Sequence, residues 1–224
     1  MTGRLAGRRV VVTDCNELIG PEIVDVFTEE GAEVLADSRD LTVPDAAAAL
    51  IEEAGRVDVL VANLAVRVSG NFAHESDDAE LDLMLDRLMR PLHRLTRAVL
   101  PQMMARRQGK IVVVGAGAAL RGVPRRSVYS AARAAQHGYV RSVAVEAALH
   151  NVQINATAQT FVENPTYFPP HYQQTEEFKE RMKNVPAGRL ASAQEAARFL
   201  LTLAGRESDF IVGQIFPFTG GWVQ

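Results

Sequence analysis

Residues 9–36, RVVVTDCNELIGPEIVDVFTEEGAEVLA, show the pattern of a strand, a helix and a second strand. Arg9–Thr13 is a short β-branched run that is typical of a buried strand. Pro21–Glu30 is a helical segment with proline near its first turn, and Gly31 ends it. Glu33–Ala36 then returns to a strand. A unit of this kind predicts two parallel strands joined by a helix.

The same alternation continues to the end of the chain. Further strands are predicted at Val57–Ala62, Lys110–Val114, Val152–Ala156 and Gly213–Phe218, and helices at Pro44–Ala54, Asp78–Arg107 (with a bend at Pro91), Tyr129–Leu149 and Ala193–Ala204. No internal repeat is present. We therefore expect one domain over residues 1–224, an α/β fold of the Rossmann type, with a doubly wound parallel sheet and helices on both faces.

Composition narrows the classes of partner. The 224 residues carry a net charge of −3, which favours neither nucleic acid nor an acidic membrane surface, and no segment reaches the roughly 18 apolar residues of a membrane span. A single cysteine, Cys15, fits a cytoplasmic protein. The histidines lack metal-ligand spacing, so no metal site is expected; they are His74, His93, His137, His150 and His171.

The loop after the first strand differs from a dinucleotide-binding loop. Such a loop needs glycines so that its backbone can approach a pyrophosphate at a helix N-terminus. Here only Gly20 is left, and Asp14 and Glu17 place carboxylates where the pyrophosphate would lie. Leu18 adds a bulky side chain at the same place. The pattern favours a loop that has lost its cofactor site over a divergent loop that still holds one.

Two residues near the start of a predicted helix suggest acid–base chemistry. Tyr129 and Arg133 are four residues apart, so they lie one turn apart on one helix face. A permanent guanidinium beside a phenol favours the ionised phenol, which makes Tyr129 a candidate base. Taken alone the motif is weak, because such pairs on helix surfaces are usually solvated.

The order of motifs along the chain resembles the short-chain dehydrogenases/reductases. VLVANLAV at 59–66, GKIVVV at 109–114, the Tyr129 helix and the segment 188–222 carry the resemblance, which covers nearly the whole chain. That family uses Tyr-x-x-x-Lys, whereas here the lysine is Arg133. The family's Asn-Asn-Ala-Gly is Asn63-Leu64-Ala65-Val66, and its helix asparagine falls at about Leu88. A βα segment is also missing before 37–42.

These losses resemble the halohydrin dehalogenases, a branch of the same fold that uses Ser-Tyr-Arg and no nicotinamide. The resemblance, closest to the shorter type, implies that Tyr129 takes a proton from a vicinal halohydrin and that an epoxide forms as halide leaves. In reverse, a small anion opens an epoxide. The resemblance also implies a homotetramer with paired long helices at one interface. It further implies a halide and substrate pocket formed by Leu18, Gln159, Thr160 and Phe161.

Residues 158–190 form the longest irregular stretch and contain four prolines, which predicts a lid loop beside the substrate. Phe161, Tyr167 and Phe168 either line that pocket or pack the lid on the core. Asp37 and Asp40, where reductases hold adenosine, are interpreted as solvated or as capping the next helix.

The catalytic serine of the family is absent. Its position, thirteen residues before Tyr129, is Ala116. Ser130 points about 100° away from Tyr129 on a helix, and Ser127 is placed to cap that helix instead. Three hypotheses remain: an impaired halohydrin dehalogenase, an NAD(P)-dependent oxidoreductase with a degenerate loop, and a relative that binds without catalysis.

Overall fold

The computed structural model describes residues 3–68 and 70–223. Six parallel strands form one sheet in the order β2-β1-β3-β4-β5-β6. Their bounds are β1 Arg9–Val12, β2 Glu33–Ala36, β3 Val59–Ala62, β4 Gly109–Ala116, β5 Val152–Gln159 and β6 Ile215–Phe218. The order reverses direction between β1 and β3, as in doubly wound folds. The predicted fold class is therefore confirmed.

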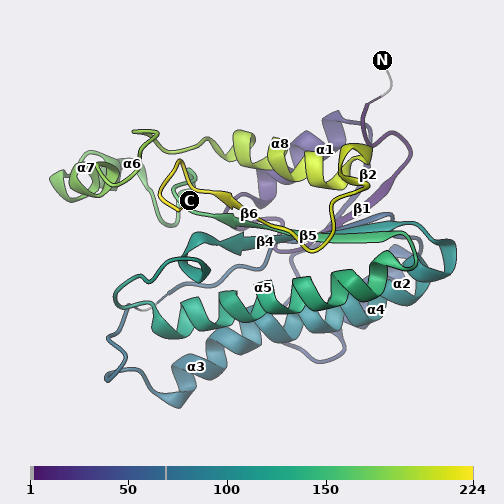
Figure 1. The fold of residues 1–224 in the computed structure, drawn as a ribbon, viewed down its shortest axis with the longest axis horizontal. Helices are drawn as coiled ribbons and strands as arrows, with labels where there is room; N and C mark the ends of the chain where they lie inside the picture. The colour runs from purple at the N-terminus through teal and green to yellow at the C-terminus, as the bar shows by residue number, and fades with distance from the viewer. Residues whose placement is uncertain (1–2, 69, 224) are drawn as a thin grey trace.

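Helices cover both faces of the sheet (Figure 1). One face carries α2 (Ala46–Ala54), α4 (Arg90–Arg106) and α5 (Ser127–Ala148), and the other carries α1 (Gly20–Glu29) and α8 (Ala193–Ala204). Strand residues alternate between the two resulting cores, because successive side chains point to opposite faces. In β4, for example, Ile111 and Val113 pack toward α5, whereas Val112 and Val114 pack toward α1 and α8.

The bend predicted at Pro91 coincides with a change of helix type. After α3 (Asp78–Met84) the chain makes a π-helical turn, η1 (Leu85–Met89), and Pro91 lies in the first turn of α4. Proline has no N–H to donate, so the start of a new helix accommodates it. The predicted helix over 78–107 is thus three consecutive segments.

The segment 158–190 is more ordered than the sequence suggests. β5 continues to Gln159, because Ala158 and Gln159 pair with β4 and β6. The stretch also contains two short helices, α6 (Pro170–Gln173) and α7 (Glu176–Met182), which lie beyond one end of the sheet in Figure 1. Proline starts α6, and the Thr175 side chain caps α7.

Two local predictions are wrong. Ser127 does not cap α5: Arg126 is the N-cap residue, with no side-chain cap bond, and Ser127 is the first helical residue. Asp37 is buried rather than solvated and pairs with Arg39, whereas Asp40 is exposed, as expected, and accepts hydrogen bonds from Thr42 in a local turn. Both aspartates therefore have local partners that the spacing alone did not indicate.

Candidate active site

The side chains of Tyr129 and Arg133 meet at the carboxyl end of the sheet. Arg133 Nε donates to Tyr129 Oη at 3.2 Å, and the guanidinium carbon lies 5.4 Å from the centre of the phenol ring. Arg133 Nη2 donates to the Leu64 carbonyl after β3, and Nη1 donates to the Val114 carbonyl within β4. The predicted one-turn spacing therefore places the guanidinium between two strand ends and the phenol.

Arg133 is only 3% exposed, and its hydrogen bonds run to neutral oxygens. Among the ion pairs of the described residues, none includes Arg133. A buried positive charge without a carboxylate partner favours a negative charge nearby. The Tyr129 hydroxyl is the side-chain group that Arg133 Nε contacts there.

Ala116 ends β4, two residues after the carbonyl that receives Arg133. It is buried and pairs in register with Gln159, whose side-chain Oε1 is buried without a hydrogen-bond partner among the described residues. Beyond Ala116, a Cβ on Gly117 would lie 3.2–3.4 Å from Thr219, Thr160 and Trp222. The position expected to carry a serine hydroxyl therefore has no hydrogen-bonding side chain of its own.

The loop after β1 is closed by its own side chains. Asp14 Oδ2 accepts from the Ala65 N–H at 2.7 Å, and Asn63 Nδ2 donates to the carbonyls of Asp14 and Glu17 at 3.0 and 3.1 Å. Burial raises the pKa of the Asp14 carboxyl, against the opposing effect of the Ala65 amide, and the charge of Glu17 raises it further. The Asp14 carboxylate therefore takes up the Ala65 N–H, which faces this loop.

The backbone of this loop is also unlike a glycine loop. Asp14 and Leu18 have positive φ angles of 43° and 55° although both carry a Cβ. Gly20 is required, since a Cβ there would lie 2.5–2.6 Å from the carbonyls of Asp14 and Cys15. A pyrophosphate needs free N–H groups and no adjacent carboxylate. The residues present therefore do not fit the phosphates of a dinucleotide.

The segment after β2 is also held by ion pairs between its own side chains and α2. Arg39 pairs with buried Asp37 at 2.5 Å and with Glu53 at 2.7 Å. Cys15, whose thiol pKa is raised by burial, donates its backbone N–H to the Asp37 carbonyl. These contacts connect the two strand ends directly.

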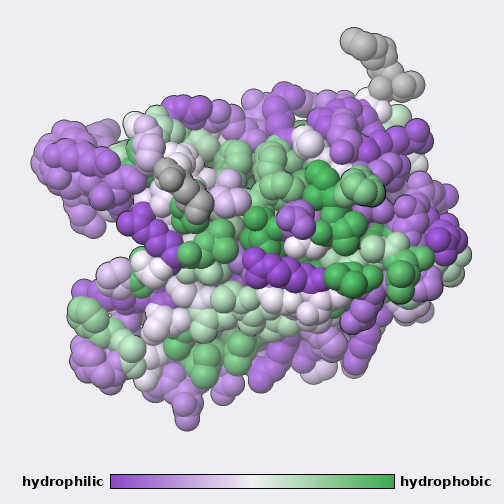
Figure 2. All heavy atoms as spheres, viewed as in Figure 1, coloured by the Kyte–Doolittle hydropathy of each residue, from purple (hydrophilic) through white to green (hydrophobic). Residues whose placement is uncertain are grey.

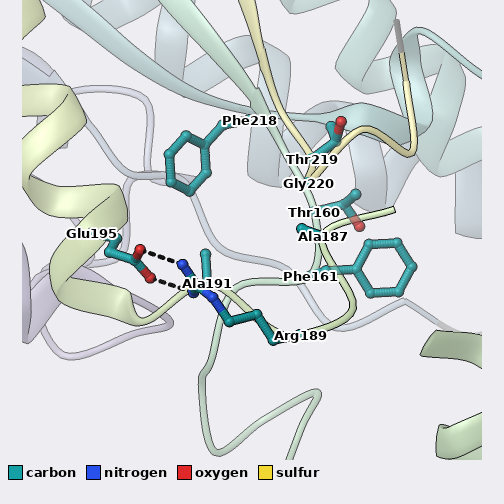
Figure 3. A pocket seen from close by; sticks show the side chains of 9 residues that line it. All are labelled: Thr160, Phe161, Ala187, Arg189, Ala191, Glu195, Phe218, Thr219 and Gly220. Atoms are coloured by element: carbon teal, nitrogen blue, oxygen red, sulfur yellow. Dashed lines mark hydrogen bonds and ion pairs between the residues drawn. The ribbon is translucent and has the colours of Figure 1, made fainter. Parts of the chain in front are cut away.

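A cavity of about 200 Å³ lies between the ends of β5 and β6 and the start of α8. Thr160 and Phe161 line it, as Figure 3 shows, together with Arg189 and Glu195, whose side chains form two hydrogen bonds of 2.7 Å. Neither Tyr129, Arg133 nor Leu18 lines this cavity. The structure therefore joins Thr160 and Phe161 in one cavity and leaves half-buried Leu18 in the loop after β1.

The Phe161 ring belongs to a separate aromatic cluster. In Figure 3 it points away from the Arg189–Glu195 pair, and it packs edge-on against Trp222 and beside Phe168. The guanidinium of Arg181 lies 5.4 Å from the Phe161 ring centre. Phe161 has a positive φ of 56°, so the chain turns sharply directly after β5. This geometry corresponds to the lid-packing alternative for the ring.

Tyr167 is a site residue whose contact could not be predicted from spacing. Its hydroxyl donates to the Val66 carbonyl at 2.6 Å, which ties the lid to the segment after β3. Burial raises the pKa of Tyr167, and the neighbouring Tyr129 adds to the effect. A lone tyrosine in a proline-rich stretch gives no signal of a partner 101 residues away.

His137 lies behind the site on α5, with both ring nitrogens buried and unpaired within the described residues. A Cβ on Gly115 would lie 2.7 Å from His137 Nε2, so glycine makes room for the ring. Burial lowers the pKa of His137 to about 4 from 6.5, and the charges of Arg141 and Arg133 lower it further.

We expect His137 to make the protein acid-sensitive. Between pH 6.5 and about 4 the unfolded chain binds a proton that the folded chain does not. The free energy of unfolding is therefore unaffected by this group above pH 6.5 and falls by about 3 kcal/mol as the pH drops to 4. Urea unfolding of wild type and His137→Leu across this range measures the difference, and parallel pH profiles would contradict it.

Comparison with known proteins defines the class. The family model described as Enoyl-(Acyl carrier protein) reductase matches residues 4–223. The chain therefore belongs to the short-chain dehydrogenase/reductase superfamily. It is 28% identical over 243 residues to Dehydrogenase/reductase SDR family member 6 of Danio rerio, covering 98% of this chain and 99% of the relative. It is 30% identical to Oxidoreductase UcpA of Escherichia coli (strain K12), covering 98% and 95%.

A solved structure described as a dehalogenation enzyme is also similar. It superposes with a TM-score of 0.91 and 30% sequence identity, and the match covers 100% of both chains. Within the described residues, no group of three or more His, Cys, Asp or Glu side chains could hold a metal ion. No helix in the part of the chain that the structure describes is long and apolar enough to cross a bilayer.

Proposed function

We propose that this chain is a halohydrin dehalogenase-like lyase that works without nicotinamide. The observation that carries the proposal is the Tyr129–Arg133 pair, set at the end of a sheet whose nucleotide loop is closed by Asp14 and Asn63. The similarity to a dehalogenation enzyme over both full chains supports it.

In the proposed reaction the Tyr129 phenolate removes the proton of the substrate hydroxyl. The alkoxide oxygen forms a bond to the neighbouring carbon as the carbon–halogen bond breaks, and an epoxide and a halide ion result. Tyr129 then returns its proton to solvent. Arg133, which donates to Tyr129 Oη, stabilises the phenolate before each turnover.

The departing halide needs hydrogen-bond donors. Phe161 has a left-handed backbone directly after β5, and a turn of this kind can direct the N–H groups that follow it toward an anion, whereas the Thr160 N–H is bonded to the Phe218 carbonyl. We propose that the turn from Gln159 to Phe161 receives the halide, and that Leu18 closes the pocket from the loop after β1. The substrate class is a small vicinal halohydrin or, in reverse, an epoxide and a small anion.

Oligomerisation is part of the same proposal. Figure 2 shows hydrophobic side chains gathered over the edge strand β6 and the carboxyl-terminal half of α5. Val145, Leu149 and Phe210 are 68%, 75% and 100% exposed. These exposed side chains favour contact of this face with a further copy of the chain. From the family resemblance we also propose a homotetramer with paired α4 and α5 helices at another interface.

The alternative is an NAD(P)-dependent oxidoreductase. It is favoured by the reductases among the sequence relatives and by the matching family model. The third hypothesis, binding without catalysis, rests on Ala116.

Halide release and cofactor binding together test these alternatives. We expect chloride or bromide release from a small vicinal halohydrin in the absence of nicotinamide, by the wild type or at least by Ala116→Ser. We also expect no change in NADH or NADPH fluorescence on titration with the protein, because the Asp14 side chain takes up the Ala65 N–H and the loop after β1 carries side chains at the left-handed positions of Asp14 and Leu18. Tight nucleotide binding would support the oxidoreductase, and silence in both assays would support the third hypothesis.

A further inference from the structure

A buried glutamine lies beside the Tyr129–Arg133 pair and has no role in the reaction described above. Gln136 is on α5 and is 0% exposed. Its Oε1 accepts from Arg133 Nη1 at 3.0 Å, and its Nε2 donates to the Leu88 carbonyl at 2.8 Å. This orientation of the amide gives each of its ends a complementary partner.

The Leu88 carbonyl belongs to the π-helical turn η1. A π-turn interrupts the regular ladder of main-chain hydrogen bonds, and such turns occur frequently at functional sites. Gln136 therefore connects the irregular turn between α3 and α4 to the guanidinium of Arg133. The connection spans 48 residues of sequence, and both of its ends are buried.

Gln136 is a third anchor of the Arg133 guanidinium, besides the two strand ends. Two of its acceptors, the carbonyls of Leu64 and Val114, are fixed by the strand ends. Nη1 is shared between Val114 and Gln136, so the amide holds the edge of the guanidinium next to α5. Because the guanidinium is planar, fixing both Nη atoms also fixes the direction of Nε, which donates to Tyr129.

We propose that Gln136 is a positioning residue that aims Arg133 Nε at Tyr129 and keeps the positive charge available to the phenolate. The inference rests on the proposed function, since it gives Gln136 a part in preparing the base. A neutral amide suits this role, because it accepts from the guanidinium without neutralising its charge.

Two substitutions separate the roles of the amide. Gln136→Glu places a carboxylate against Arg133, which competes with the phenolate for the positive charge, and it also removes the donor to Leu88. Gln136→Met keeps a similar volume and removes both hydrogen bonds. Gln153→Glu is the matched control, because Gln153 is a buried glutamine on β5 that bonds to Asn151 instead.

The test is ultraviolet difference titration of Tyr129, with the Tyr129→Phe form of each protein as the blank. We expect the midpoint of phenol ionisation to move to higher pH by about one unit in Gln136→Glu, and in the same direction by less in Gln136→Met. The midpoint in Gln153→Glu stays at the wild-type value. Where halide release is measurable, kcat falls about tenfold in both Gln136 variants and KM is unchanged.

The proposal is overturned if both Gln136 variants, folded by near-ultraviolet circular dichroism, titrate at the wild-type midpoint. If only Gln136→Met folds, its midpoint decides. The titration needs no substrate, so a protein that fails to release halide but shows the shift would contradict the proposed function and leave the role of Gln136 supported.

Discussion

Ala116→Ser is expected to raise the rate of halide release about a hundredfold, because one preorganised hydrogen-bond donor contributes roughly 10²–10³ in rate. Ala116 ends β4 close to the carbonyl that holds Arg133, and it has no group that can bond to a substrate oxygen. The serine hydroxyl would bind the substrate hydroxyl while Tyr129 removes its proton. Halide release from a bromohydrin at saturating and limiting concentrations measures the gain.

The matched control for this substitution is Ala119→Ser, which adds the same hydroxyl in the next turn, η2 (Gly117–Ala119). It is expected to leave the rate unchanged. An equal gain in both variants would show that a general change in the segment, rather than a donor at position 116, is responsible. No gain in Ala116→Ser would count against the assignment of this position.

Tyr129→Phe is expected to lower halide release by about 10²–10⁴-fold, the range typical of a lost general base. The substitution removes Oη, the atom that accepts from Arg133, and keeps the ring. It is best measured in the Ala116→Ser background, where the starting rate is higher. The loss should appear in kcat, because the base acts in the chemical step.

Tyr139→Phe provides the comparison on the same helix, since the Tyr139 hydroxyl bonds to His93 rather than to Arg133. We expect this variant to retain the parent rate. If Tyr129→Phe also retains it while both proteins keep the parent melting temperature, another group is the base and the proposed mechanism is wrong.

Most of the fold could be predicted because its periodicity is strong. The run predicted as a strand at 9–13 forms β1 over 9–12, and the helix predicted at 193–204 is found at those positions, because both have strong local preferences. The end of β5 was missed because Ala158 and Gln159 carry no strand signal of their own. They are extended because β4 and β6 pair with them on both sides.

The part of the site that could be predicted is the part whose side chains come from a single helix. Tyr129 and Arg133 are one turn apart, so spacing alone brings their side chains together. The partners of Gln136 and Tyr167 come from segments 48 and 101 residues away. Such contacts depend on how helices and loops pack on the sheet, and local sequence patterns do not predict that packing. The buried pairing of Asp37 with Arg39 was missed because exposure after a strand depends on tertiary packing.

The lid has a core of its own. Phe161, Phe168, Val185 and Leu190 form a cluster apart from the two that flank the sheet, and residues of α6 and α7 pack against that cluster. The two ends of the lid lie side by side, joined by a bridge between Val162 and Ala191. A segment with its own core and adjoining ends can be exchanged as a cassette. On the proposed function, transplanting residues 161–190, which carry this whole cluster, is expected to change which substrates are accepted while Tyr129 and Arg133 stay in place on α5.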